Sequence, residues 1–358
     1  MNGNKYKTRG DHFMRLLKPP KLNLGDKVAT VSLGWGGAGD TGIKWRYKQG
    51  KKQLEEEFGL EVVEMPHTLA GSEFVYQNPE KRAEDLMSAF SDPTIKAIFC
   101  CIGGNESIRM LPYIDLNVIK ENPKLFVGYS DNTVAHFICL KAGLSSMYGP
   151  SILVDFAETG GIPSYTKNSV VQTLFASDPI GDVPVSPTWT NDLFDWRDES
   201  TKKKKRSFQP NRPYEFIQGD QAVQGRLIGG CFEVIETLKG TSLFPDLSAF
   251  QGAILFLETS EVQAPSWYLE DGLRNYGTTG VLNELSGIVF AKPQHDVFYE
   301  EYKAIIVKVL AEFQLQHLPV LYNASFGHNE PQCIIPIGVM ASLDPIKGTF
   351  SLLEAAVN

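Results

Sequence analysis

Short apolar runs alternate with amphipathic stretches along most of this sequence. In the first half, the pattern predicts strands at 26–33, 60–65, 95–102 and 125–129, and helices at 43–58, at 80–90 and directly after residue 131. In the second half, after a unit at 225–239, it predicts strands at 253–258, 287–291 and 318–322, a helix at 298–313 and a final β pair within 334–352. Such alternation is typical of β-α units around a largely parallel sheet.

The length and a lapse in this pattern divide the chain. At about 150 residues per domain, 358 residues correspond to roughly two domains. Between 178 and 214 the alternation gives way to Pro, Asp and Trp residues and to a basic run at 202–206. We therefore predict an α/β protein with an N-terminal Rossmann-like or flavodoxin-like parallel-sheet domain at 22–165, a linker at 166–220, and a smaller C-terminal α/β domain with a mixed sheet at 221–358. Residues 1–21 form an N-terminal extension in this interpretation.

Composition and charge narrow the range of partners. Hydrophobic residues make up 42% and charged residues 21% of the sequence, which fits a folded globular protein. The 34 basic and 42 acidic residues give a net charge of −8, which argues against binding to a nucleic acid polymer or an anionic membrane. No apolar run approaches the roughly 18 residues of a membrane span, and the polar N-terminus lacks a signal-peptide core. We expect a cytoplasmic protein with a small-molecule or peptide partner.

The sequence offers little support for metal or cofactor chemistry. The five cysteines lie in apolar runs without C-x-x-C spacing, so we expect five buried thiols, and the six histidines show no zinc-site spacing. One alternative is a dinucleotide-binding oxidoreductase, because Gly34–Gly39 spells G-x-G-x-x-G after a strand and Glu64 ends the next strand. Residues 40–42 delay the helix that should begin at the third glycine. We therefore favour a flexible glycine loop and predict no metal and no cofactor.

A serine stands at a strand-to-helix junction, in the sequence Phe126-Val127-Gly128-Tyr129-Ser130-Asp131-Asn132-Thr133. A serine on such a sharp turn projects its hydroxyl above the sheet, and the amides that open the following helix favour an oxyanion. Asn132 stands where the common G-x-S-x-G pattern has its second glycine, so the match is imperfect. Ser130 is therefore either a nucleophile or the N-cap of a helix whose apolar face is Val134, Phe137 and Ile138.

Two further side chains follow strands in the second half of the chain. Glu258 ends the apolar run 253–257, and a carboxylate at the carboxyl end of a parallel strand points into the crevice where such folds bind ligands. His328 lies in a turn soon after the strand at 318–322. Taken singly, Glu258 is an ordinary strand-capping charge and His328 a surface histidine. Together with Ser130 they follow the chain order Ser, acid, His of a hydrolase triad.

At these residues the sequence resembles the LD-carboxypeptidase family of serine peptidases. The matching pieces are Gly25-Asp26, Cys101-Ile102-Gly103-Gly104, Gly128-Tyr129-Ser130-Asp131, Gly225-Arg226-Leu227-Ile228-Gly229-Gly230, Leu257-Glu258 with Glu261, and Gly327-His328. The resemblance implies that Ser130 is the nucleophile, that His328 is general base and then general acid, and that Glu258 orients the imidazole. It also implies an oxyanion hole made by the amides of Gly104 and Asp131, and a homodimer.

Departures from the family pattern bear on the substrate. After Glu258 the chain reads Thr259-Ser260-Glu261-Val262-Gln263, where carboxypeptidase relatives tend to have further acidic residues and a Tyr-Arg pair. The long aromatic linker with Trp196 resembles the branch of microcin C immunity proteins, which implies an aminoacyl-nucleotide substrate whose base stacks on the tryptophan. The substrate-binding residues implied are Trp196, Gly103, Asn105 and Glu261. Two alternatives stay open: a murein tetrapeptide L,D-carboxypeptidase, and a Trp196 that only packs the linker against the body.

Overall fold

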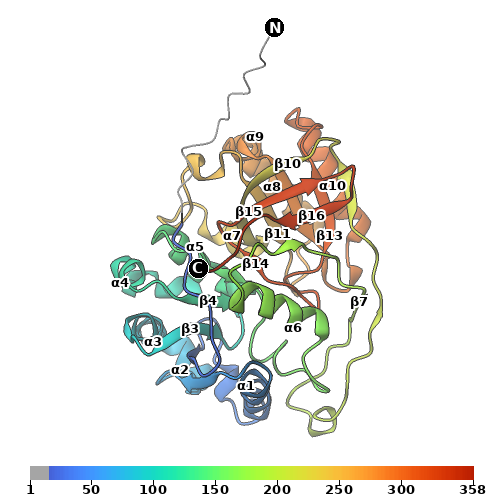
Figure 1. Ribbon diagram of the computed structural model, residues 1–358. Coiled ribbons are helices and arrows are strands. Elements are labelled where there is room, and N and C mark those ends of the chain that lie inside the picture. Colours follow the sequence, from blue (N-terminus) through green and yellow to red (C-terminus); the bar gives the residue numbers. More distant parts are fainter. Residues whose placement is uncertain (1–15) are drawn as a thin grey trace.

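Two sheets organise the molecule, and the computed structural model describes residues 16–358. Figure 1 shows the blue-to-cyan part of the chain around one sheet and the orange-to-red part around the other, with helices covering the sheets. Of the predicted N-terminal extension, residues 1–15 lie outside the described part of the chain. Leu16 is buried, and the backbone N–H of Leu17 donates a hydrogen bond to the carbonyl of Gly143.

The first sheet has six strands in the order β14-β5-β4-β3-β1-β2, and its neighbours are parallel except at the β14–β5 edge. Its strands are β1 (Lys27–Val31), β2 (Glu61–Glu64), β3 (Ile95–Cys100), β4 (Leu125–Gly128), β5 (Met147–Tyr148) and β14 (Ile335–Pro336). The helices of this half are α1 (Lys44–Phe58), α2 (Ser72–Gln77), α3 (Pro79–Ser91), α4 (Leu116–Glu121), α5 (Thr133–Lys141) and α6 (Ser164–Val170). The predicted parallel sheet is confirmed.

The second sheet has eight strands in the order β6-β16-β15-β10-β11-β12-β13-β9, parallel from β10 to β13 and antiparallel on both sides. Its strands are β6 (Gly181–Asp182), β9 (Glu215–Gln218), β10 (Val223–Cys231), β11 (Ile254–Glu258), β12 (Gly287–Ala291), β13 (Val320–Ala324), β15 (Met340–Asp344) and β16 (Thr349–Leu352). Its helices are α7 (Phe232–Leu238), α8 (Ser266–Thr278), α9 (Val281–Glu284) and α10 (Tyr299–Glu312). The predicted mixed sheet is confirmed, and it has two strands more than the first.

The prediction for 334–352 is wrong in one respect. β15 and β16 do form an antiparallel pair, but Ile335 and Pro336 pair with Tyr148 and Met147 at the edge of the first sheet. The C-terminal part of the chain therefore returns to the N-terminal sheet. A short strand carries no local mark of which sheet edge it joins, because its partners lie far away in the sequence.

Helix α5 is buried along nearly its whole length, from Thr133 to Leu140. The sequence predicts one apolar face, whereas the structure packs α5 against the first sheet and also against α7 of the second half. His136, which is not part of the predicted apolar face, is buried as well. Its ring bonds to Ser146 Oγ and to the carbonyl of Gly128, both at 2.8 Å. The helix after the serine is thus a contact between the two halves.

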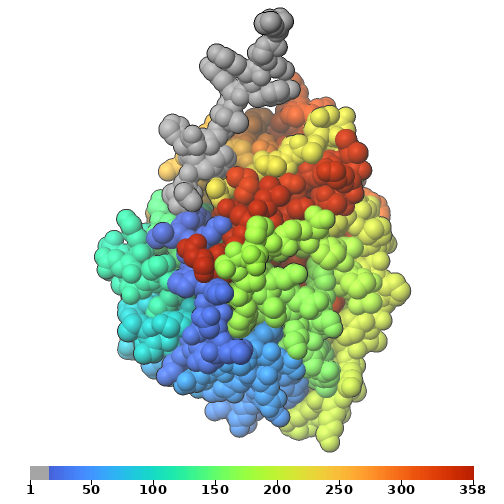
Figure 2. Space-filling model, in the orientation of Figure 1, coloured from blue at the N-terminus to red at the C-terminus, as the bar shows by residue number. Residues whose placement is uncertain are grey.

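The part of the predicted linker at 178–214 has little regular structure. Its short strands are β6, which pairs with β16, and β7 (Thr188–Trp189), which pairs with β8 (Gln209–Pro210). It is nevertheless packed against the body, since Trp189, Thr190 and Thr201 are buried. Figure 2 shows this yellow-green segment along one side of the surface, reaching from the red part of the chain toward the blue part. The linker therefore contacts both halves.

The five cysteines are all buried and free, which confirms the prediction of buried thiols. Within residues 16–358, no helix is long and apolar enough to cross a membrane. In the same part of the chain, no three His, Cys, Asp or Glu side chains are grouped so that they could hold a metal ion.

Candidate active site

Turns that follow strands of both sheets line one cavity of about 660 Å³. Ser130 follows β4, the turn with Gly103 follows β3, and His328 follows β13. The cavity lining includes eight of the residues predicted from the sequence: Gly103, Gly104, Asn105, Ser130, Asp131, Trp196, Glu261 and His328. Glu258 lies behind His328 and is 1% exposed. The structure therefore brings together residues that are up to 225 positions apart, from Gly103 to His328.

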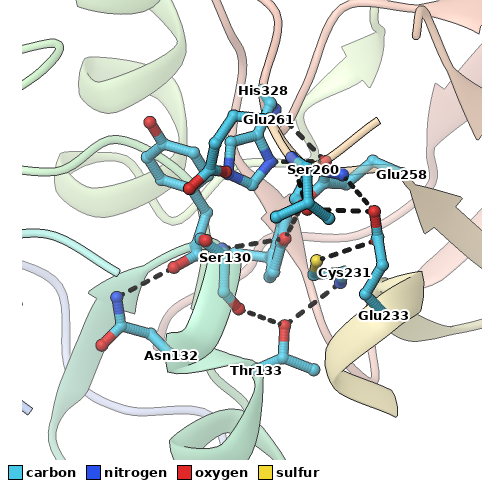
Figure 3. A network of polar contacts seen from close by, with 12 residues as sticks. Ser130, Asn132, Thr133, Cys231, Glu233, Glu258, Ser260, Glu261 and His328 are labelled. Atoms are coloured by element: carbon cyan, nitrogen blue, oxygen red, sulfur yellow. Dashed lines mark hydrogen bonds and ion pairs between the residues drawn. The ribbon is translucent and has the colours of Figure 1, made fainter. Parts of the chain in front are cut away.

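Ser130 sits on a strained turn. Its φ of 64° is in the left-handed region, which residues other than glycine rarely occupy. Its carbonyl accepts a hydrogen bond of 2.7 Å from Thr133 Oγ1, and Thr133 in turn accepts the amide N–H of Cys231 at 3.1 Å (Figure 3). This short chain of bonds connects the turn with the carboxyl end of β10. The position of the serine thus depends on how the two sheets pack together.

Gly103 lies directly against Ser130. A Cβ at Gly103 would be 2.6 Å from the Cβ of Ser130 and 2.7 Å from its hydroxyl oxygen, which is closer than atoms can approach. The amide nitrogen of Asp131 lies 3.2 Å from the same point. The carboxylate of Asp131 accepts the amides of Glu106 and Ser107 at 2.9 and 2.8 Å, so it holds the turn that contains Gly103 next to the serine. The hydroxyl of Ser130 and the amide nitrogen of Asp131 therefore both lie against Gly103.

A carboxylate holds one side of the His328 ring. Nδ1 lies 2.7 Å from Glu258 Oε2, and the backbone N–H of His328 donates to the same oxygen at 3.3 Å. Burial disfavours the charged imidazole. The field of Glu258 and the hydrogen bonds to Glu258 and Glu261 outweigh burial and raise the pKa of His328 well above its usual range. His328 also packs edge-on against the Tyr129 ring, with centroids 5.0 Å apart, which places it beside the serine turn.

The other ring nitrogen of His328 faces Glu261. Nε2 lies 2.8 Å from Glu261 Oε2, so both nitrogens have a carboxylate partner (Figure 3). This hydrogen bond lowers the pKa of Glu261 to about 2. The side chain of Glu261 is 57% exposed, whereas that of Glu258 is 1% exposed. The two carboxylates thus hold the same imidazole from a buried and from an exposed position.

Tyr148 is a site residue that sequence analysis did not find. Its hydroxyl donates to Glu258 Oε1 at 2.5 Å and accepts the N–H of Ser130 at 3.1 Å. The side chain is fully buried, and burial together with the charge of Glu258 raises the pKa of Tyr148 well above its usual range. A tyrosine on a two-residue strand looks like an ordinary core residue, because its partners come from other turns.

Trp196 is half-buried at the cavity wall and packs against the guanidinium of Arg46, whose carbon lies 4.8 Å from the ring centroid. The indole N–H of Trp45 donates to the carbonyl of Trp196 at 2.8 Å. Burial lowers the pKa of Arg46 to about 10. The ring is therefore supported by α1 while it lines the cavity. This geometry is compatible with both roles predicted for Trp196.

The basic run of the linker contributes a buried ion pair that the sequence analysis also missed. Arg206 pairs with Glu158 and, at 3.4 Å, with Glu330, and the three side chains are 5–10% exposed. Glu330 is two residues after His328, and its carbonyl accepts the N–H of Thr190 at 3.0 Å. The linker is thus tied to the turn that carries the histidine. Within the run, nothing in the local sequence separates Arg206 from its solvated neighbours.

The glycine-rich segment Gly34–Gly39 is packed rather than flexible, which corrects the sequence-based interpretation. A Cβ at Gly34 would be 2.5 Å from Asp131 Oδ2, and one at Gly39 would be 2.4 Å from the carbonyl of Leu69. Helix α1 begins at Lys44, five residues after the last glycine of the motif. Close backbone packing accounts for these glycines without a bound dinucleotide.

The fold and the site define a hydrolase built on two α/β halves. Residues 28–149 match the model of the LD-carboxypeptidase N-terminal domain and residues 224–343 that of the C-terminal domain, so the chain belongs to the LD-carboxypeptidase family. A Vibrio cholerae protein named as a carboxypeptidase is 29% identical over 315 residues, which are 86% of this chain and 89% of that protein. The Escherichia coli microcin C7 self-immunity protein MccF is 27% identical over 279 residues, covering 77% of this chain and 78% of MccF.

Among solved structures, an MccF-like protein from Streptococcus pneumoniae in complex with AMP superposes with a TM-score of 0.83. It is 30% identical and covers 92% of this chain and 99% of its own. Membership in this family shows that the chain is a hydrolase of the peptidase type.

Proposed function

We propose that this protein is a serine hydrolase that removes an aminoacyl group from a nucleotide-like leaving group through an acyl-enzyme. The observation that carries the chemistry is the His328–Glu258 pair beside the strained Ser130 turn, in one cavity. In this proposal Ser130 is the nucleophile, His328 the general base and acid, and Glu258 the residue that fixes the ring through Nδ1.

The reaction has two balanced halves. Ser130 Oγ attacks the carbonyl carbon, and its proton moves to His328 Nε2, while the amides of Gly104 and Asp131 stabilise the negative oxygen. When the bond to the leaving group breaks, the proton on Nε2 passes to that group. Water then attacks the acyl-enzyme in the same way, giving its proton to Nε2, from which Ser130 regains it. The buried hydroxyl of Tyr148 keeps Glu258 and the turn of Ser130 in register.

The linker side of the cavity supports a nucleotide-like leaving group. Trp196 lines the cavity with one face held by Arg46, and stacking of a base on an indole contributes about 1–3 kcal/mol. The S. pneumoniae relative was solved with AMP, and a structure of MccF is a complex with aspartyl sulfamoyl adenosine. We propose that Gly103 and Asn105 contact the acyl part of such a substrate. We also propose that the protein is a homodimer and acts in the cytoplasm.

The test compares aspartyl sulfamoyl adenosine with a murein tetrapeptide, with intact mass and released products as readouts. We expect turnover of the first, loss of turnover and of any acyl-enzyme mass shift in Ser130→Ala, and a nearly equal loss in His328→Ala. The double variant should lose little more, because members of a triad act as a unit. Turnover of the tetrapeptide alone would favour an L,D-carboxypeptidase. Full activity of Ser130→Ala would refute the mechanism.

A further inference from the structure

The Glu261–His328 ion pair leaves the proposed triad incomplete in the ligand-free protein. Nε2 is the atom that must take the proton of Ser130, but it is 2.8 Å from Glu261 Oε2. With carboxylates at both nitrogens, the imidazole is held in its charged form and carries a proton where the mechanism needs a lone pair. Something must remove Glu261 from Nε2 before Ser130 can react.

In the described part of the chain, the basic group paired with Glu261 is His328 itself. The titratable groups that face the ring are Glu258 at the end of β11, Glu261 after it, Tyr129 after β4 and Glu233 on α7. Burial and the charge of Glu258 raise the pKa of Glu233, and its carboxylate is occupied by the N–H and hydroxyl of Ser260. Among the described residues, the other basic groups that line the cavity, Arg46, Lys204 and Arg206, come from α1 and the linker. These three groups have other partners: Arg46 lies over Trp196, Lys204 over Phe194, and Arg206 pairs with Glu158 and Glu330. The competing cation therefore comes from the substrate.

We infer that Glu261 binds the free α-ammonium group of the substrate's aminoacyl part, and that this exchange of partners frees His328 Nε2 for Ser130. The inference rests on the proposed function. The α-nitrogen is attached to the carbon next to the carbonyl under attack, so it arrives close to Nε2 and to the carboxylate beside it. Because the side chain of Glu261 is 57% exposed, it can turn toward the ammonium group without opening the core. The bound ammonium replaces the imidazolium as the local cation, and the Nε2 proton passes to solvent.

This exchange selects a class of substrate. An aminoacyl nucleotide carries a free α-amine next to its reactive carbonyl. In a murein tetrapeptide, the residue on the acyl side of the cleaved bond has its α-nitrogen in a peptide bond, which is uncharged and cannot replace an imidazolium at Glu261. The contact therefore favours single aminoacyl groups over internal positions of a peptide.

The experiment measures kcat/KM for aspartyl sulfamoyl adenosine and its Nα-acetyl derivative, with the wild type, Glu261→Gln and the control Asp192→Asn. Asp192 is another carboxylate that lines the cavity, and its partner is Ser207 rather than His328. We expect Glu261→Gln to lose about 10- to 100-fold on the free amine, the range for a lost charge-assisted hydrogen bond. On the acetyl derivative it should keep or gain activity, because that substrate cannot displace Glu261 from Nε2 in the wild type. Asp192→Asn should change both substrates alike. Equal losses on both substrates in Glu261→Gln, or a gain on both, would overturn the inference.

A second measurement separates this inference from the proposed function, because it needs no turnover. In the Ser130→Ala protein, NMR follows the titration of the His328 ring. Saturating aspartyl sulfamoyl adenosine should lower the pKa of His328 by about one unit or more, since the ring loses one carboxylate, whereas the Nα-acetyl derivative should not. A shift in the absence of wild-type turnover would refute the proposed reaction and keep the amine site. The same response to both ligands, or none to either, would overturn the amine site.

Discussion

Replacement of Tyr148 by Phe removes one oxygen from the buried centre of the site. That oxygen donates to Glu258 at 2.5 Å and accepts the N–H of Ser130 at 3.1 Å, and the residue is fully buried. The ring itself keeps its packing against Phe256, 5.6 Å away between centroids, because Phe has the same shape. The change therefore isolates the two hydrogen bonds.

The loss of stability follows from the hydrogen bonds that Glu258 and the N–H of Ser130 lose. A hydrogen bond to a charged carboxylate contributes about 1.5–3 kcal/mol, and a buried N–H without a partner costs about 1–3 kcal/mol, so Tyr148→Phe should destabilise the fold by about 2.5–6 kcal/mol. With an unfolding entropy of about 2.1 cal/mol/K per residue over 358 residues, this corresponds to a fall in Tm of about 3–8 °C. Glu258 also loses the bond that aligns it with His328. We expect kcat to fall about 10- to 100-fold, on the scale of one lost charged hydrogen bond.

The assay combines thermal unfolding with turnover of aspartyl sulfamoyl adenosine. Tyr276→Phe is the matched control, because Tyr276 is also buried but its hydroxyl has no hydrogen-bond partner among the described residues. Removing that hydroxyl should change the free energy of unfolding by less than about 0.5 kcal/mol. If Tyr148→Phe unfolds at the same temperature as Tyr276→Phe and keeps its kcat, the bridge described here does not support the site.

Three further predictions concern the cavity wall and the buried charges. Trp196→Ala should lower kcat/KM for aspartyl sulfamoyl adenosine about 5- to 150-fold and leave a substrate without a base nearly unchanged, whereas equal losses would mean that the ring only supports the linker. Arg206→Met should destabilise the fold by about 3–5 kcal/mol in urea unfolding, because it leaves two buried carboxylates without their cation, and the exposed Lys203→Met should change little. A cost below about 1 kcal/mol for Arg206→Met would contradict this. Burial, followed by the charge of Glu330, raises the pKa of Asp155 to about 7. In urea unfolding, the wild type should therefore lose free energy of unfolding relative to Asp155→Asn as pH rises from about 4 to about 7. A difference between the two proteins that stays constant over this range would refute the shift.

The sequence predicted the regular elements best where their cause is local. Strand β12 lies where the apolar run predicts it, at Gly287–Ala291, and α10 and α3 agree within one or two residues. Helix α8, at Ser266–Thr278, was not predicted, because its pattern is interrupted by Gly272 and Gly277. Both glycines lie against aromatic rings, Phe232 and Phe313, where any larger residue would clash. The two glycines in α8 are thus explained by packing against these rings, although glycine has a low helix propensity.

The sequence alone determined which residues lie at or just after the ends of strands, since turn chemistry and apolar runs are local properties, and it thereby singled out Ser130, Glu258 and His328. The resemblance also paired Glu258 with His328, but only the tertiary structure decided their other partners. The pairing of His328 Nε2 with Glu261 and the bridge made by Tyr148 depend on atoms that the two sheets bring together from distant positions. Hydrogen bonds and ion pairs act over about 3 Å, so a residue's chemical state is set by neighbours in space, which the order of residues along the chain does not specify.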